Sequence, residues 1–194
     1  MDLQTRVRDI LTRPAHAWAV IAGEPADVGS LLRDYAAPLS TIPAICSWLG
    51  MSVIGMSTLV GTYRVGIVRG LANAIVAWAF GLAGAWLAAV VIERLAPNFS
   101  SRGSTADALK LVVYASTPVW LAGVFNLIPA LGVLVLVAAL YALYLFYLGL
   151  PVVMHTPADK VVPFMAVAAV AVIVVMIVVG MVAGAIAGVG RMTI

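Results

Sequence analysis

Charged residues are scarce in this chain of 194 residues: Asp, Glu, Lys and Arg make up 10% of it, whereas 64% is hydrophobic. In an ordinary soluble domain roughly a quarter of the residues are charged, so a soluble fold of this composition could not cover its surface. A lipid bilayer makes such a composition stable, because apolar side chains that face acyl chains carry no hydration penalty. The length suits one compact bundle. We therefore predict an all-α integral membrane protein with a single transmembrane domain.

The residues that build catalytic, metal or cofactor sites are also few. Cys46 is the single cysteine, and His16 and His155 are the only histidines. A metal site of His155 with nearby carboxylates can be drawn, but no pair has a metal-ligand spacing such as His-Glu-x-x-His. Those carboxylates are Glu93, Asp107 and Asp159. The chain also lacks a phosphate-binding loop, a Gly-x-Ser-x-Gly elbow, a Cys-x-x-Cys pair and any run of Lys or Arg. We predict no catalytic residue, no metal, no cofactor and no nucleic-acid partner.

Long gaps between charged residues locate the membrane spans, since a helix needs about 20 mostly apolar residues to cross a core of about 30 Å. Four gaps qualify; they enclose 29, 23, 48 and 30 residues after Asp34, Arg69, Lys110 and Lys160. As one helix, the third gap would be roughly 72 Å long and must turn. Pro129 marks that turn, because proline cannot continue the helical hydrogen-bond ladder. The predicted spans are 38–60, 71–95, 108–127, 130–153 and 161–189.

The orientation follows from the uneven distribution of Lys and Arg over the two sides of a five-span topology. One side receives three of them: Arg64, Arg69 and Arg191. The other side receives eight: Arg6, Arg8, Arg13, Arg33, Arg94, Arg102, Lys110 and Lys160. Eight against three predicts a cytoplasmic N-terminus and a C-terminus outside.

Residues 1–34 precede the transmembrane domain of residues 35–194 and have an amphipathic pattern. Leu3, Val7 and Ile10 recur near helical spacing with Arg6 and other arginines between them, and Pro14 starts a second short helix that carries Trp18. Such a segment can lie in the headgroup plane, with the tryptophan in the interfacial belt and the arginines near anionic lipid. The alternative is that it packs as a cytoplasmic cap on the bundle.

Two predicted spans carry small residues at every fourth position, which places each set on one helix face. The sets are Ala77, Gly81, Ala85 and Ala89 in the second span, and Gly180, Gly184 and Gly188 in the fifth. Small residues let two helix backbones approach closely in lipid. The contact can be made within one chain or with a second copy, and we expect the former.

Ionisable residues are essentially absent from the predicted spans, although such residues usually mark proton or ion routes. Asn73 and Asn126, together with Ser, Thr and Tyr hydroxyls, are the polar groups available in the membrane. This pattern disfavours a proton-coupled pump. It leaves a lipid-handling protein, a passive pore and a structural membrane factor.

Several motifs spread over nearly the whole chain are similar to the bacterial branch of the Yip1 family. The most distinctive resemblance is the stretch from Tyr141 to Pro151, which includes Tyr144 and Gly149. The other matching positions are Pro14, Trp18, Glu24, Pro97, Phe99, Tyr114, Pro118, Pro129, Pro157, Asp159 and Lys160. The resemblance implies five helical spans and a cytoplasmic N-terminus, in agreement with the charge count. Eukaryotic relatives act in vesicle trafficking with Rab-type GTPases, but this chain resembles the bacterial members, for which no such partner is implied.

The resemblance and the residues together lead us to expect a non-enzymatic membrane organiser or interaction scaffold in the bacterial inner membrane. Its partners would be the bilayer and a second copy or another membrane protein. The alternative is a transporter or channel for small molecules, ions or lipids that uses kinks in spans three and four. Pro118 and Pro151 interrupt backbone hydrogen bonding there, where neighbouring hydroxyls can repair it.

Overall fold

Five apolar helical spans form the body of the molecule in the computed structural model, which describes residues 2–25, 27–58 and 61–189. They run alongside one another, and each is long and apolar enough to cross a membrane. Their bounds are Val28–Ile54, Ile67–Phe99, Thr105–Leu127, Ala130–Val153 and Ala158–Ala185. The predicted fold class is confirmed.

Each span is built from consecutive helical segments. The first consists of α3 (Val28–Ser30), the π-helical η1 (Leu31–Ala36), α4 (Ala37–Leu49) and the π-helical η2 (Gly50–Ile54). The second and third are α5 (Ile67–Leu95) with η3 (Ala96–Phe99), and α6 (Thr105–Ala115) with α7 (Thr117–Ala122) and η4 (Gly123–Leu127). The fourth and fifth are η5 (Pro129–Gly132) with α8 (Val133–Val153), and η6 (Ala158–Lys160) with α9 (Val161–Val189).

The first span differs from the predicted range of 38–60. Its helix begins ten residues earlier, at Val28, where the Asp27 side chain accepts a hydrogen bond of 2.6 Å from the Ser30 backbone N–H. This bond lowers the pKa of Asp27. The helix ends at Ile54, because Gly55 has φ 81°, a conformation that glycine adopts readily. Charge gaps missed both ends, since charged residues fit in a helix at the membrane boundary and a chain can leave the helix within an apolar stretch.

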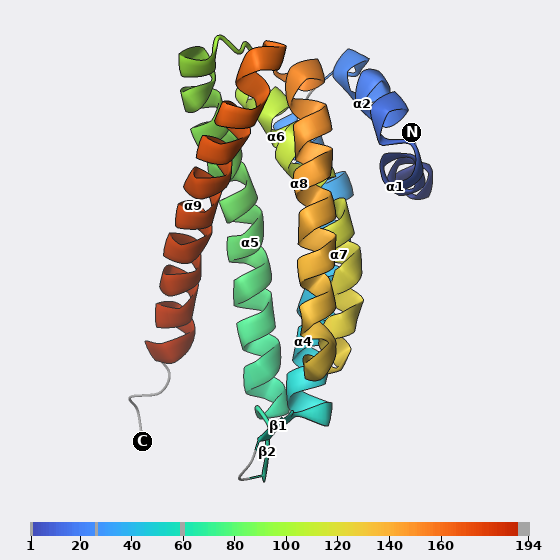
Figure 1. Cartoon of the computed structure of the whole chain (residues 1–194). Coiled ribbons are helices and arrows are strands. Elements are labelled where there is room, and N and C mark those ends of the chain that lie inside the picture. Colours follow the sequence, from blue (N-terminus) through green and yellow to red (C-terminus); the bar gives the residue numbers. More distant parts are fainter. Residues whose placement is uncertain (1, 26, 59–60, 190–194) are drawn as a thin grey trace.

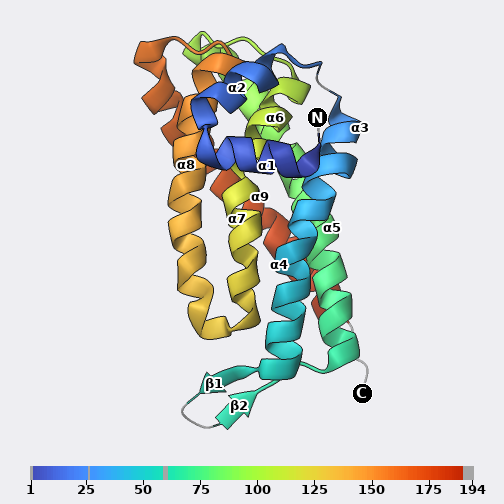
Figure 2. The ribbon, with the colours of Figure 1, turned by 90° about the vertical axis from the view of Figure 1, so that its right-hand side faces the viewer.

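A short antiparallel hairpin of β1 (Met56–Thr58) and β2 (Gly61–Tyr63) follows the first span. It was not predicted, and it lies at the end of the bundle opposite the N-terminal helices (Figure 2). At the same end the chain turns between η4 and η5, as Pro129 predicted, and Ile128 between them is extended. The third and fourth spans therefore form a tight helical hairpin (Figure 2).

The N-terminal segment folds as α1 (Leu3–Thr12) and α2 (Pro14–Gly23), with Pro14 at the first helical position. Figure 2 shows α1 lying across the spans near one end of the bundle. Its apolar Leu3, Val7 and Leu11 pack against the core, while Gln4 and Arg8 are exposed. The apolar side of this amphipathic helix thus covers the bundle.

The best-packed part of the core surrounds α6. Every residue from Ala108 to Ala115 is buried, and the helix contacts α5, α8 and η1. Its start is fixed by a capping box, in which Ser104 and Asp107 satisfy each other's backbone N–H groups. This central helix supplies Lys110 and Tyr114, which contact the N-terminal segment.

Close backbone approach occurs at glycines that the small-residue pattern did not select. A Cβ on Gly50 would lie 2.2 Å from the Asn126 carbonyl oxygen, and one on Gly123 would lie 2.5 Å from the Cβ of Pro43. These two contacts join the first span to the third.

The small-residue faces of α5 and α9 line one cleft of about 480 Å³ from opposite walls. A Cβ added at Gly81, Gly180 or Gly184 would meet no atom within 4 Å, so the backbones do not touch at these positions within one chain. The reason is that α9 diverges from α5 toward its C-terminal end (Figure 1). The two helices approach each other at Gly84, whose Cβ would lie 3.3 Å from the Met176 sulfur. Use of the face by a second copy stays a prediction.

Candidate functional site

Arg6 is the buried charged residue of α1. Its side chain is 5% exposed and donates a hydrogen bond to the carboxylate of Glu24, which is 38% exposed. The guanidinium carbon lies 5.6 Å from the centroid of the Tyr114 ring on α6, within the range of a cation–π contact. A buried charge requires such partners, because desolvation without them is costly. We name Arg6, Glu24, Lys110 and Tyr114 the N-terminal clasp.

Lys110 is the second buried cation of the clasp and is 3% exposed. Its ammonium group donates to the Ile21 carbonyl oxygen at 3.0 Å and to the Glu24 carbonyl oxygen, and the Asp107 carboxylate lies 3.9 Å away. The C-terminal carbonyls of α2 carry partial negative charge that favours a cation. Lys110 lies near the start of the third span, within the predicted range 108–127, although the charge count assigned it to a loop.

Trp18 is fully buried, which corrects the expectation that it lies in the interfacial belt. Its ring meets Tyr114 edge-on, with the centroids 6.3 Å apart. A Cβ on Gly149 of α8 would lie 2.7 Å from the Trp18 ring, so only glycine leaves room for it. Four positions of the family resemblance, Trp18, Glu24, Tyr114 and Gly149, thus meet at one place.

A chain of hydroxyl hydrogen bonds crosses the break in the third span. Pro118 has no N–H for the carbonyl four residues earlier, that of Tyr114, and the Thr117 hydroxyl donates to this carbonyl oxygen at 2.8 Å instead. The Tyr35 hydroxyl lies 2.8 Å from the Thr117 hydroxyl and donates to it, since the Thr117 proton is already used. The predicted repair of the proline break by neighbouring hydroxyls is therefore present.

A cleft of about 430 Å³ opens beside the clasp, between α1, the end of α2 and η1. Its charged lining consists of one cation, Arg6, and two carboxylates, Glu24 and Asp34. The carboxylate of Asp34 accepts from the exposed Arg33 at 2.7 Å. The remaining lining residues are Leu3, Pro25, Ser30, Leu31, Tyr35 and Tyr114.

A second group of family-motif positions lies in the connections α5–α6 and α8–α9. Phe99 of η3, which also contains Pro97, stacks on Phe164 with the ring centroids 4.7 Å apart. Lys160 donates to the Ser100 hydroxyl at 2.7 Å. In the same connection, Pro157 directly precedes η6 and Asp159 lies within it.

The remaining motif positions are not part of either group. Pro129 starts η5 at the far end of the bundle, and Tyr144 on α8 is 48% exposed. Pro151 lies inside α8, which continues to Val153. Tyr141, the first residue of the same motif stretch, donates its hydroxyl proton to the Leu11 carbonyl oxygen at 2.8 Å and so holds the end of α1.

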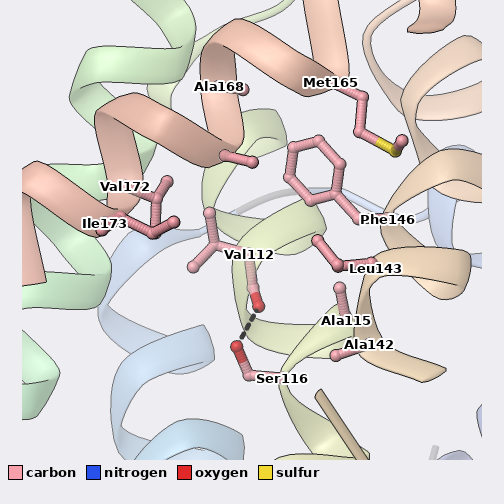
Figure 3. A pocket seen from close by; sticks show the side chains of 11 residues that line it. Val112, Ala115, Ser116, Ala142, Leu143, Phe146, Met165, Ala168, Val172 and Ile173 are labelled. Carbon is pink, nitrogen blue, oxygen red and sulfur yellow. Dashed lines mark hydrogen bonds between the residues drawn. The ribbon is translucent and has the colours of Figure 1, made fainter. Parts of the chain in front are cut away.

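A smaller pocket of about 210 Å³ adjoins the break in the third span. Figure 3 shows Val112, Phe146 and Val172 approaching it from three different helices. The Ser116 hydroxyl also borders it but donates to the Val112 carbonyl oxygen at 2.7 Å, as the dashed line indicates (Figure 3). The pocket therefore presents an apolar lining.

Metal-ligating side chains do not gather within the part of the chain that the structure describes: no group of three or more His, Cys, Asp or Glu residues could hold an ion there. Glu93 accepts a hydrogen bond from Thr105, Asp107 caps α6, and His155 lies 3.3 Å from the Arg102 carbonyl oxygen.

Comparison with known proteins assigns the sequence to a family. The sequence model of the Yip1 domain matches residues 8–181. The inner membrane protein YohC of Escherichia coli strain K12 is 30% identical over 151 residues, which cover 76% of this chain and 77% of that protein. The protein of the same name from Escherichia coli O6:H1 gives the same values. No solved structure matches the chain.

The hydroxyl chain generates a prediction for the buried Thr117. Thr117→Val keeps the shape of the side chain but leaves the Tyr114 carbonyl and the Tyr35 hydroxyl without this partner, and we expect a loss of about 1–3 kcal/mol in unfolding free energy. Thr117→Ser keeps the hydroxyl and is the matched control. The thermal unfolding midpoint in detergent measures both variants, and a Val variant as stable as the wild type would contradict the assignment.

Proposed function

The chain belongs to the Yip1 domain family, and from this premise we propose that it is a membrane-organising scaffold without enzymatic activity. The observation that carries the proposal is the N-terminal clasp. Two buried cations tie α1 and α2 to the spans: Lys110 of α6 binds carbonyls at the end of α2, and Arg6 of α1 lies over the Tyr114 ring of α6. A segment held in this way acts as a fixed part of the bundle surface.

The position of α1 supports a role at the membrane boundary. It lies across the spans near one end, whereas the hairpin β1–β2 lies at the other (Figure 2). The exposed side of α1, with Gln4 and Arg8, is polar and basic and suits contact with lipid headgroups or a partner. A rigid body that is wider at one end displaces more lipid in one leaflet, which is a physical route to organising a membrane.

For the location, we propose the bacterial inner membrane, with the N-terminus and α1 in the cytoplasm and the C-terminus outside. The relative YohC is named as an inner membrane protein, and the eight-to-three distribution of Lys and Arg supports the orientation. The bilayer would be the first partner, with a second copy or another membrane protein beside it. The division of the chain at residues 34 and 35 also stays a proposal, since the family match begins at residue 8 and includes most of the N-terminal segment.

The rival function is transport of a lipid or small molecule through the broken third span. The observation in its favour is the pocket of about 210 Å³ beside Ser116. Its apolar lining suits an acyl chain better than a polar solute or ion, because a buried polar ligand needs hydrogen-bond partners.

The orientation is tested with reporter fusions. A reporter that follows Ile194 should be active only outside the cytoplasm, and one inserted near Ser104 only inside it. The two positions should lie on opposite sides because three spans separate them. Cytoplasmic activity of the C-terminal fusion would overturn the proposed topology.

Reconstitution of the full chain into liposomes tests the function. We expect no flux of ions, small solutes or labelled lipid above that of protein-free vesicles. We also expect this narrowing: the mean vesicle diameter, measured by electron cryomicroscopy, should decrease as the protein content rises. Gly149→Ala should weaken the narrowing, because its Cβ displaces the Trp18 ring and loosens the N-terminal segment. Gly81→Ala is the matched control, since its Cβ meets no atom within 4 Å. Reproducible flux would favour the transporter. Equal vesicle diameters for the two variants would show that the clasp is not needed for the proposed function.

A further inference from the structure

The cleft beside the clasp has the chemistry of a headgroup site. We propose that it binds a zwitterionic group in which a phosphate is joined to a primary ammonium, as in an aminophospholipid. The inference rests on the proposed function and deepens it, since it names the lipid class that the organising face would hold.

Arg6 is the group that would receive the phosphate. A guanidinium has five N–H donors, and among the described residues Glu24 is the only hydrogen-bond acceptor of the Arg6 side chain. Arg6 lines the cleft although its side chain is 5% exposed, so its remaining donors border a confined space. Arginine donors at such a site fit phosphate oxygens in shape and charge.

The two carboxylates of the lining would receive the ammonium. Glu24 and Asp34 come from the end of the N-terminal segment and from η1, and each pairs with an arginine, Glu24 with Arg6 and Asp34 with Arg33. A headgroup that carries only negative charge would meet one cation in the lining and two carboxylates that repel it. A headgroup that carries one charge of each sign is matched by opposite charges on both of its groups.

The cleft distinguishes a primary ammonium from a quaternary one. Quaternary ammonium groups are bound mainly over aromatic faces, and the Tyr114 ring already has the Arg6 guanidinium 5.6 Å from its centroid. The carboxylates instead offer hydrogen-bond acceptors, which a primary ammonium can use and a quaternary one cannot.

The place of the cleft in the fold fits a lipid. It lies at the start of the first span, where a membrane-spanning helix meets the headgroup region. Leu3 and Leu31 add apolar surface for the glycerol and the first acyl carbons. Its volume of about 430 Å³ lies within the roughly 300–1,000 Å³ that is usual for ligand sites. The wall formed by η1 is π-helical, a distortion that is frequent at functional sites.

Native mass spectrometry of the full chain in detergent tests the proposal. With an equimolar mixture of phosphatidylethanolamine, phosphatidylglycerol and phosphatidylcholine, we expect one phosphatidylethanolamine adduct to dominate. Asp34→Asn should weaken this adduct about tenfold, the effect of losing a charged hydrogen-bond partner. Asp34 is exposed, so the substitution leaves the core intact. Asp9→Asn is the matched control, because it removes a carboxylate from the N-terminal segment that does not line the cleft.

The arms of the experiment separate its outcomes. Competition by soluble glycerophosphoethanolamine would support the headgroup chemistry with a free compound as its source, and resistance to competition would support the membrane lipid. Equal adducts of all three lipids, or an adduct unchanged in Asp34→Asn, would overturn the proposal. If Asp34→Asn fails to purify as a folded protein, Asp34→Ser takes its place with the same expectation. If the wild type shows no lipid selectivity in mass spectrometry and no flux in liposomes, only the proposed lipid site is contradicted. Flux in liposomes would instead contradict the proposed function.

Discussion

The ion pair between Arg6 and Glu24 is the interaction on which the rest of this structure depends. Arg6 is almost completely removed from solvent, and a cation in that position is tolerable only with a carboxylate and an aromatic ring beside it. Because α1 supplies Arg6, the end of α2 supplies Glu24 and α6 supplies Tyr114, satisfying this one charge fixes the N-terminal segment on the bundle. Lys110 adds a second tie from α6 to the end of α2.

The break in the third span is the necessary counterpart of this arrangement. Pro118 ends the regular hydrogen bonding of α6, and the hydroxyls of Thr117 and Tyr35 restore what the proline removes. The same Tyr35 ring packs edge-on against Tyr114, with the centroids 4.6 Å apart. The kink, the clasp and the adjoining cleft thus share Tyr114, and a change at one of them reaches the others.

Composition and charge spacing were sufficient to predict the span count, the tight turn at Pro129 and the helix pair of the N-terminal segment. These features depend on local chemistry: apolar length, proline geometry and amphipathic periodicity. The residues of the family resemblance pointed to Trp18, Glu24, Tyr114 and Gly149 as a set, but gave no geometry. The burial of Arg6 and Lys110 could not be predicted from the sequence, because it depends on contacts between residues far apart in the chain. Lys110 and Ile21, for example, are 89 positions apart. On the small-residue faces, Ala85 and Ala89 are buried, whereas an added Cβ at Gly81, Gly180 or Gly184 meets no atom within 4 Å, since four-residue spacing identifies a helix face but not the distance to the next helix.

The central claim, that buried charge pairing holds the N-terminal segment on the spans, is most directly tested by limited trypsin digestion of the detergent-solubilised full chain. Cleavage after Arg8, which is exposed on this segment, reports how often the segment opens. Glu24→Gln should accelerate cleavage about tenfold, equivalent to about 1.4 kcal/mol of lost pairing energy, because Arg6 loses its charged partner. Asp2→Asn, which removes an exposed carboxylate at the start of α1 outside the clasp and away from the cleaved bond, should be cleaved at the wild-type rate. Equal cleavage rates for the wild type and Glu24→Gln would contradict the account.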